Sequence, residues 1–185
     1  MFRSLLALAA LSFVSSLCLD AGALLCVDWS ITAGIVTFNS TCSPYQGSAT
    51  TWCAFGVAAT KPLSMFPADV AAVVSAVPAA GAAAKIWVED RANVAFAVPQ
   101  CFAVQTSVLT PGSASVDAHG VLRATWSRPA TLPAPLLAAG YVNLKGPMFM
   151  IAASSTDANN ATLSVCDNTY LPVHTFAQTA IAVTF

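Results

Sequence analysis

Short apolar runs alternate with clusters of turn-forming residues along most of the chain, and this alternation determines the expected fold. The runs span about four to nine residues and are rich in Val, Ile, Thr and aromatic side chains, a composition typical of strands. We expect strands over residues 31–38, 51–57, 68–74, 85–89, 94–98, 102–109, 121–127, 148–154, 162–165 and 180–184.

Turn-forming residues mark where these strands should end. The alanine-rich stretch 68–84 invites a helical interpretation, but Pro78 and Gly81 would end any such helix early. About ten strands with no room for crossover helices predict an all-β fold, an antiparallel immunoglobulin-like β-sandwich. The expected breaks fall at 44–48, 61–64, 78–81, 111–115, 118–120, 129–135 and 157–160.

The N-terminus has the pattern of a secretory signal peptide. Arg3 precedes an apolar run over residues 5–17, and small residues follow it. We expect a signal at 1–23, cleaved after Cys18 or after Ala23, and a single domain at 24–185 that is secreted. The apolar run is shorter than the roughly 20 residues that a bilayer-spanning helix needs, which disfavours a retained anchor.

Composition excludes several classes of partner. Only 8% of the 185 residues are charged, 57% are hydrophobic and the formal net charge is -1. The chain therefore lacks the basic surface that nucleic acids or anionic membranes would require. A second apolar stretch at 66–88 is interrupted by Asp69, Pro78 and Lys85, so we expect no membrane span in the mature chain.

The cysteines and two glycosylation sequons agree with secretion. Six cysteines are present, and removal of Cys18 with the signal would leave an odd number. Disulfides are expected in an oxidising compartment, although spacing alone does not give their pairing. The tripeptides that begin at Asn39 and Asn160 fit the N-glycosylation pattern, so we expect a glycoprotein with both asparagines on surface loops.

Five motifs follow one another along residues 25–185 in an order that resembles a DOMON domain. They are an aromatic-plus-Gly strand with a following loop methionine, an acidic pair before Arg, a Gly-Val-Leu to Arg-Pro strand, an apolar strand ending in small residues, and a late histidine. In this chain they occupy WCAFGVAATKPLSMFPADVAAVV at 52–74, IWVEDR at 86–91, HGVLRATWSRP at 119–129, PMFMIAAS at 147–154 and YLPVHTF at 170–176.

The resemblance is strongest to the branch that binds haem b, represented by the cytochrome domain of cellobiose dehydrogenase and the auxin-induced apoplastic cytochromes. In that branch the loop methionine and the late histidine are the axial iron ligands. The positions that match them here are Met65 and His174. The resemblance thus implies a haem b (iron) cofactor and one-electron transfer.

The same resemblance implies what the protein would interact with. A cytochrome of this kind would exchange electrons with a redox partner protein or a small reductant such as ascorbate. Other DOMON domains bind no haem. The alternative is therefore a haem-free extracellular module that binds a carbohydrate or another small ligand, or mediates adhesion.

Each candidate iron ligand also has a possible structural role. Met65 could fill a core gap, but prolines on both sides of it predict a constrained loop that can aim a ligand. His174 could be a partly exposed strand residue, and only the resemblance favours ligation. His119 is predicted to be a solvated turn residue. Met148 and Met150 are predicted to line the core or a pocket, and Trp52, Phe66 and Phe149 are candidate haem-wall residues.

Catalytic patterns find little support. The chain has no Gly-x-Ser-x-Gly elbow, no recognisable Ser/His/Asp or Cys/His setting and no glycine-rich phosphate loop. The sequence therefore favours a non-catalytic electron-transfer or binding domain over an enzyme.

Overall fold

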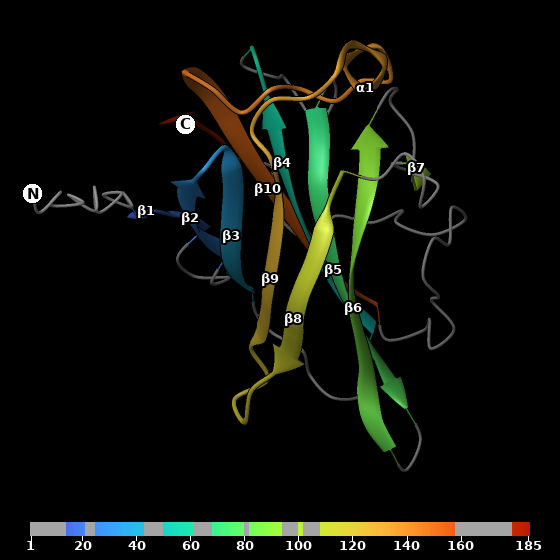
Figure 1. Cartoon of the computed structure of the whole chain (residues 1–185). Coiled ribbons are helices and arrows are strands. Elements are labelled where there is room, and N and C mark those ends of the chain that lie inside the picture. The colour runs from blue at the N-terminus through green and yellow to red at the C-terminus, as the bar shows by residue number, and fades with distance from the viewer. Residues whose placement is uncertain are drawn as a thin grey trace, which may run out of the picture.

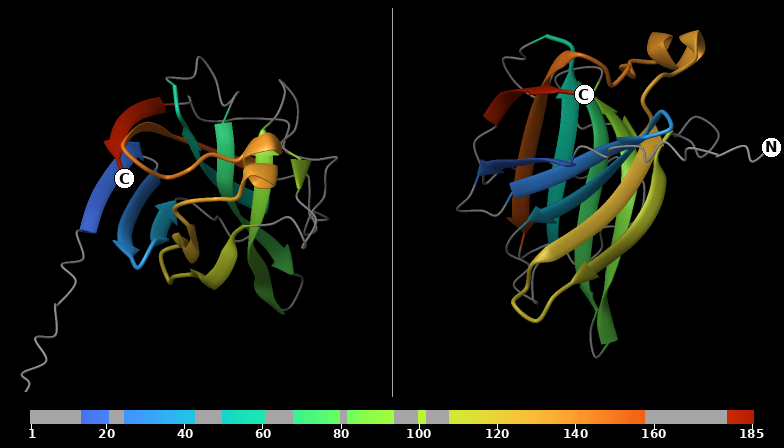
Figure 2. Two further views of the ribbon diagram at one scale, coloured as in Figure 1. Left: turned by 45° about the horizontal axis from the view of Figure 1, so that its top comes forward. Right: turned by 60° about the vertical axis from the view of Figure 1, so that its left-hand side comes forward.

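The computed structural model consists of two antiparallel β-sheets packed face to face, with one short helix (Figures 1 and 2). It describes residues 14–20, 25–42, 50–60, 68–79, 82–93, 100–101, 108–157 and 179–185. The expected all-β antiparallel sandwich is confirmed. The expected strands at 94–98 and 162–165, and most of that at 102–109, lie outside the described residues.

Each sheet combines strands from distant parts of the chain. The five-stranded sheet has the order β1-β2-β3-β9-β8, and the six-stranded sheet the order β11-β10-β4-β5-β6-β7. The strands are β1 (Val14–Asp20), β2 (Leu25–Thr32), β3 (Ile35–Cys42), β4 (Thr50–Ala58), β5 (Ala68–Ala79), β6 (Ala82–Asn93), β7 (Gln100–Cys101), β8 (Thr110–Val116), β9 (Leu122–Pro129), β10 (Pro147–Asp157) and β11 (Thr179–Thr184).

A tight hairpin separates β2 from β3, where the sequence had predicted one strand over 31–38. Ala33 and Gly34 both have positive φ, at 50° and 78°. Two central residues with positive φ make a turn whose twist matches antiparallel strands. The prediction was wrong because apolar residues continue on both sides of the turn, and a two-residue Ala-Gly loop interrupts the pattern too briefly to stand out.

The edge strand β8 is a second correction. Residues 111–115 were expected to break the chain, yet they pair with β9, with a register shift between Pro111 and Ala114. Proline is tolerated on an edge strand or at a bulge, where its missing N–H costs no ladder hydrogen bond. Gly112 is needed there, because a Cβ at this position would come within 2.8 Å of the Thr125 carbonyl oxygen.

Aromatic side chains from both sheets meet in the core. Trp126 on β9 is 2% exposed, and its ring centroid lies 5.4 Å from Phe38 on β3 and 5.8 Å from Phe55 on β4. Strand β9 alternates buried and more exposed positions along its length, as a half-buried strand should. The pattern of β9 thus follows from one face packing on the opposite sheet.

Strand β4 differs, because every residue from Trp52 to Ala58 is buried. Cys53, Phe55 and Val57 belong to the core between the sheets. The alternating residues, including Trp52, Ala54 and Ala58, must therefore be buried on the opposite face of the same sheet. A strand with both faces buried reads as a continuous apolar run, and this explains the uninterrupted WCAFGVA sequence.

The segment between β9 and β10 closes one end of the sandwich and contains helix α1 (Ala134–Ala138), at the top of Figure 1. The sequence had predicted only a break here. Leu132 and Leu144 are buried, and the Leu144 N–H donates to the Ala130 carbonyl at 2.8 Å. None of the helices in the described ranges is long and apolar enough to cross a bilayer.

Two disulfides join strands. Cys18 on β1 bonds Cys26 on β2 within one sheet, with 4.0 Å between their Cα atoms. Cys42 on β3 bonds Cys53 on β4 and therefore links the two sheets, with 6.5 Å between their Cα atoms. The expectation of disulfides is thus confirmed.

Truncating Trp126 tests the aromatic core. We expect Trp126→Ala to lower the free energy of unfolding by about 3–5 kcal/mol, through lost transfer energy and the cavity left behind. Ile35 is 41% exposed, so Ile35→Ala serves as the control and should change the value by less than about 0.5 kcal/mol. Urea unfolding followed by tryptophan fluorescence and circular dichroism measures both, and equal effects would contradict the assigned core.

The Cys18–Cys26 disulfide tests where the chain is processed. Cleavage after Cys18 or after Ala23 would remove one sulfur of this bond, and cleavage after Ala23 would also take Leu19, only 6% exposed, out of the core. We therefore expect secreted protein to retain Cys18. N-terminal sequencing and non-reducing peptide mapping measure this, and a mature N-terminus at Leu19 or Leu24 would contradict it.

Candidate functional site

The two expected iron ligands lie in connections that the structure does not describe. Met65 and the adjacent Phe66 fall within 61–67, between β4 and β5, and His174 falls within 158–178, just before β11. The structure therefore does not give the positions of these side chains. It does describe the strands that anchor both connections. Those strands belong to the same six-stranded sheet.

Strand register gives the separation of the two anchors. Asp69 on β5 pairs with Val57 on β4, and Phe55 on β4 pairs with Ala152 on β10, which pairs with Thr179 on β11. Asp69 and Thr179 are thus three strand spacings and two residues apart, which corresponds to about 16 Å.

The covalent reach of the chain exceeds this separation. Met65 is four residues from Asp69 and His174 is five residues from Thr179. Extended segments of these lengths span about 13 Å and about 17 Å respectively. The anchors therefore allow both side chains to approach a common point.

The described residues around Trp126 leave little free space between the sheets. Phe55, Trp126 and Met150 surround a void of about 10 Å³, together with Val27, Phe38, Gly56 and Val57. Such a void holds at most about one water molecule. Met148 and Met150 are 3% and 1% exposed and belong to the core, so their expected role in core or pocket lining is confirmed as core.

A second apolar surface lies on the other face of the six-stranded sheet. We call it the outer platform, and it consists of Trp52, Ala54 and Ala58 on β4 with Phe149 on β10. Phe149 is paired with Ala58, and Phe149 alternates with the core residues Met148 and Met150. Two candidate haem-wall residues, Trp52 and Phe149, therefore share one face, next to small side chains.

Arg128 is a fully buried cation near the end of β9. It is 1% exposed; one guanidinium nitrogen donates to the Val142 carbonyl at 2.7 Å, and the guanidinium carbon lies 5.7 Å from the centre of the Tyr141 ring. Burying a charge is costly unless polar and aromatic partners compensate. Arg128 therefore ties the segment after β9 to the strand.

A polar groove of about 340 Å³ crosses the outward face of the five-stranded sheet. Sequence reasoning did not find it, although the alternation of polar with apolar residues in β2, β3 and β9 was a usable signal. Most of its lining side chains carry hydroxyl, amide or charged groups. The lining residues are Cys26, Asp28, Asn39, Ser40, Thr41, Ser113, Ser115, Arg123, Ala124 and Thr125.

The turn at one end of the groove is organised by Asp117. Its carboxylate accepts hydrogen bonds from the His119 N–H at 2.8 Å and the Val121 N–H at 3.1 Å, and it forms an ion pair with Arg123 at 3.1 Å. His119 is exposed, and its prediction as a solvated turn residue is confirmed. Within the part of the chain that the structure describes, no three His, Cys, Asp or Glu side chains cluster as metal ligands.

Comparison with known proteins identifies the fold. No family model matches the chain, and no curated protein sequence matches it. Among solved structures, the cytochrome domain of Myriococcum thermophilum cellobiose dehydrogenase superposes with a TM-score of 0.53. The alignment covers 94% of this chain and 82% of that domain at 14% sequence identity. At this level of identity the similarity shows a shared fold.

Acid titration tests the Asp117 turn. Hydrogen bonds from the Val121 and His119 N–H groups, and the Arg123 charge, lower the pKa of Asp117 below its ordinary value of 3.8. A lowered folded-state pKa means that the carboxylate stabilises the fold above about pH 3.8, and that this contribution disappears as the pH falls through the lowered pKa.

We therefore expect Asp117→Asn to be less stable than the parent at neutral pH, with the difference shrinking below pH 3.8. Urea unfolding at a series of pH values measures this. The matched control is His119→Ala, which removes only an exposed side chain and keeps the backbone donor. A stability difference that grows in acid would contradict the assigned carboxylate role.

Proposed function

We propose that the protein is a secreted b-type cytochrome that carries single electrons, with haem held by Met65 and His174. The observation that carries this proposal is the fold, which is shared over 94% of the chain with a domain described as a cytochrome domain. The two donors of the proposed set occur in connections of one sheet, at the positions where the DOMON resemblance expects them.

Three features of the described residues fit this cofactor. The anchors of the two connections lie close enough for Met65 and His174 to share an iron. The void around Trp126, at about 10 Å³, is too small to contain a macrocycle, so haem would have to lie elsewhere. The outer platform, whose β4 residues are buried, places small side chains beside Trp52 and Phe149 on the sheet that carries both connections.

The chemistry of the two side chains accounts for an electron carrier better than for an oxygenase. Bound haem would supply an iron that alternates between ferric and ferrous states. Thioether sulfur is a soft donor that favours the ferrous state, whereas imidazole binds both states well. If Met65 and His174 both coordinate, protein side chains occupy both axial positions, and substrate or dioxygen has no coordination position to take.

Secretion fits the two disulfides, which persist in oxidising compartments. A carrier outside the cell would exchange electrons with a separate redox protein or a small reductant. The alternative function, a haem-free module that binds a carbohydrate or another small ligand, is an outcome of the experiment below.

Haem-replete expression tests the proposal. We expect a red protein with a low-spin haem b spectrum that sharpens on dithionite reduction. His174→Ala should bind haem poorly or leave it high-spin, because imidazole is the stronger donor. Met65→His should keep the haem but lower its reduction potential, because a second imidazole favours ferric iron more than sulfur does. Optical spectra and redox titration measure these changes.

Two matched variants control for the residue type. His119→Ala removes an exposed turn histidine, and Met150→Leu replaces a buried core methionine with a side chain of similar volume. Neither should alter the spectrum or the potential. A folded but colourless protein would favour the haem-free alternative, and loss of the low-spin spectrum in His119→Ala alone would mean that the wrong histidine was assigned.

A further inference from the structure

Asn39 lies on strand β3, in the middle of the polar groove. The sequence had led us to expect this residue on a surface loop. In β3 its Cα pairs with Asp28 of β2 on one side and with Thr125 of β9 on the other. Directly opposed residues on one face of a sheet have Cβ atoms about 5 Å apart. The Asn39 side chain is exposed and is therefore flanked by a carboxylate and a hydroxyl in the floor of the groove.

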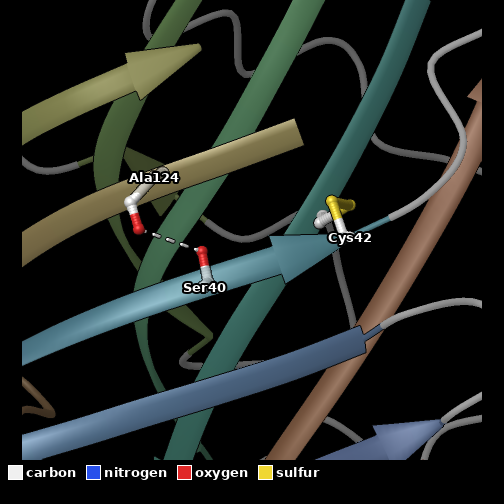
Figure 3. The surroundings of a disulfide bond; sticks show 4 residues. Ser40, Cys42 and Ala124 are labelled. Carbon is white, nitrogen blue, oxygen red and sulfur yellow. Dashed lines mark hydrogen bonds between the residues drawn. A yellow bond between two sulfur atoms is a disulfide. The ribbon is translucent and has the colours of Figure 1, made fainter. Parts of the chain in front are cut away.

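The strand also presents the rest of the glycosylation signal. Asn39 and Thr41 alternate with buried neighbours and line the same groove, so acceptor and hydroxyl share the outward face. Ser40 between them is 4% exposed and points inward, with its hydroxyl 3.5 Å from the Ala124 carbonyl (Figure 3). Asn39 and Thr41, which the glycosylation signal requires, therefore face outward, whereas Ser40 faces the interior.

The groove has the volume and the chemistry of a sugar subsite. Its volume of about 340 Å³ lies at the lower end of the roughly 300–1,000 Å³ usual for ligand pockets. Asp28, Ser115 and Arg123 supply acceptors and donors along its walls, which suits a ligand rich in hydroxyl groups. The Asp117 ion pair holds Arg123 at 3.1 Å and so limits the positions that its guanidinium can take.

The chemistry of the lining also decides between a free and an attached sugar. Aromatic side chains do not occur among the residues that line the groove, so a free saccharide would find hydrogen bonds but no apolar platform. A tethered ligand needs much less affinity, because attachment raises its effective concentration to the millimolar range or above. The groove therefore suits a sugar that is covalently bound beside it.

We infer that Asn39 carries an N-linked glycan whose first sugars occupy the polar groove. In the attachment step the Asn39 amide nitrogen forms a bond to C1 of an oligosaccharide, loses a proton, and displaces the lipid diphosphate that carried the sugar. The inference depends on passage through the secretory pathway and does not depend on haem. The glycan covers the outward face of the five-stranded sheet, on the opposite side of the sandwich from the outer platform.

The first measurement is site occupancy. The full chain is secreted from eukaryotic cells, and the peptide containing Asn39 is analysed by mass spectrometry before and after peptide N-glycosidase, which converts a glycosylated Asn to Asp. We expect a glycan at Asn39, its loss in Asn39→Gln, and its retention in Thr41→Ser, which keeps the hydroxyl. An unmodified Asn39 in secreted parent protein would overturn the inference, as would retention of the chain inside the cell.

The second measurement is protection by the groove. If the first sugars lie in the groove, the glycosidase should release the glycan about ten-fold more slowly from folded than from urea-unfolded protein, the factor that one to two net hydrogen bonds provide. Asp28→Ala removes one wall and should reduce this ratio. Equal release from folded and unfolded parent protein would overturn occupancy of the groove. Haem content, read from the same samples, reports separately on the proposed cytochrome function.

Discussion

The packing of Phe38 and Trp126 against Phe55 holds the two sheets face to face, and most other features of the molecule depend on it. These rings come from three strands that are far apart in sequence but meet between the sheets, with centroid separations of 5.4 Å and 5.8 Å. Apolar burial of this size is the dominant favourable term in folding. Strands β3, β4 and β9 each contribute one of these buried rings to the core. Outward-facing residues of β2, β3 and β9 line the polar groove on the other side of their sheet.

The same packing limits where function can reside. Among the described residues, Trp126, Phe55 and Met150 surround a void of only about 10 Å³. The outer faces of the sheets and the connections at their ends, where binding residues are usually concentrated, are the other places to consider. The outer faces of the two sheets differ in their chemistry. The outer platform is apolar and borders the connections that carry Met65 and His174, whereas the polar groove surrounds Asn39.

The sequence was informative wherever local pattern and tertiary environment agreed. The sandwich, the strands around Trp52, Trp126 and Met150, and the turn at His119 all followed from periodicity and turn chemistry. The Ala33-Gly34 hairpin, the proline-containing β8 and helix α1 did not, because a brief turn, an edge position and a short loop helix leave weak local signals. Polar alternation in β2, β3 and β9 indicated an exposed face, but the groove itself could not be derived, since Asp28, Asn39 and Thr125 become neighbours only through strand register. Met65 and His174 came from family resemblance, and the described residues constrain them only through their anchors.

The disulfide between Cys42 and Cys53 has a chemical consequence for the proposed electron carrier. A cystine is itself an electron acceptor, and thiol reductants cleave it when a thiolate can attack one of its sulfurs. Cys42 is 2% exposed and Cys53 is fully buried, so such a thiolate cannot reach the bond while the sheets remain packed. Burial thereby protects this disulfide from reduction by thiols. If the protein carries single electrons as proposed, those electrons need not reduce the covalent link between the sheets, and the scaffold would keep this link while reductants are present outside the core.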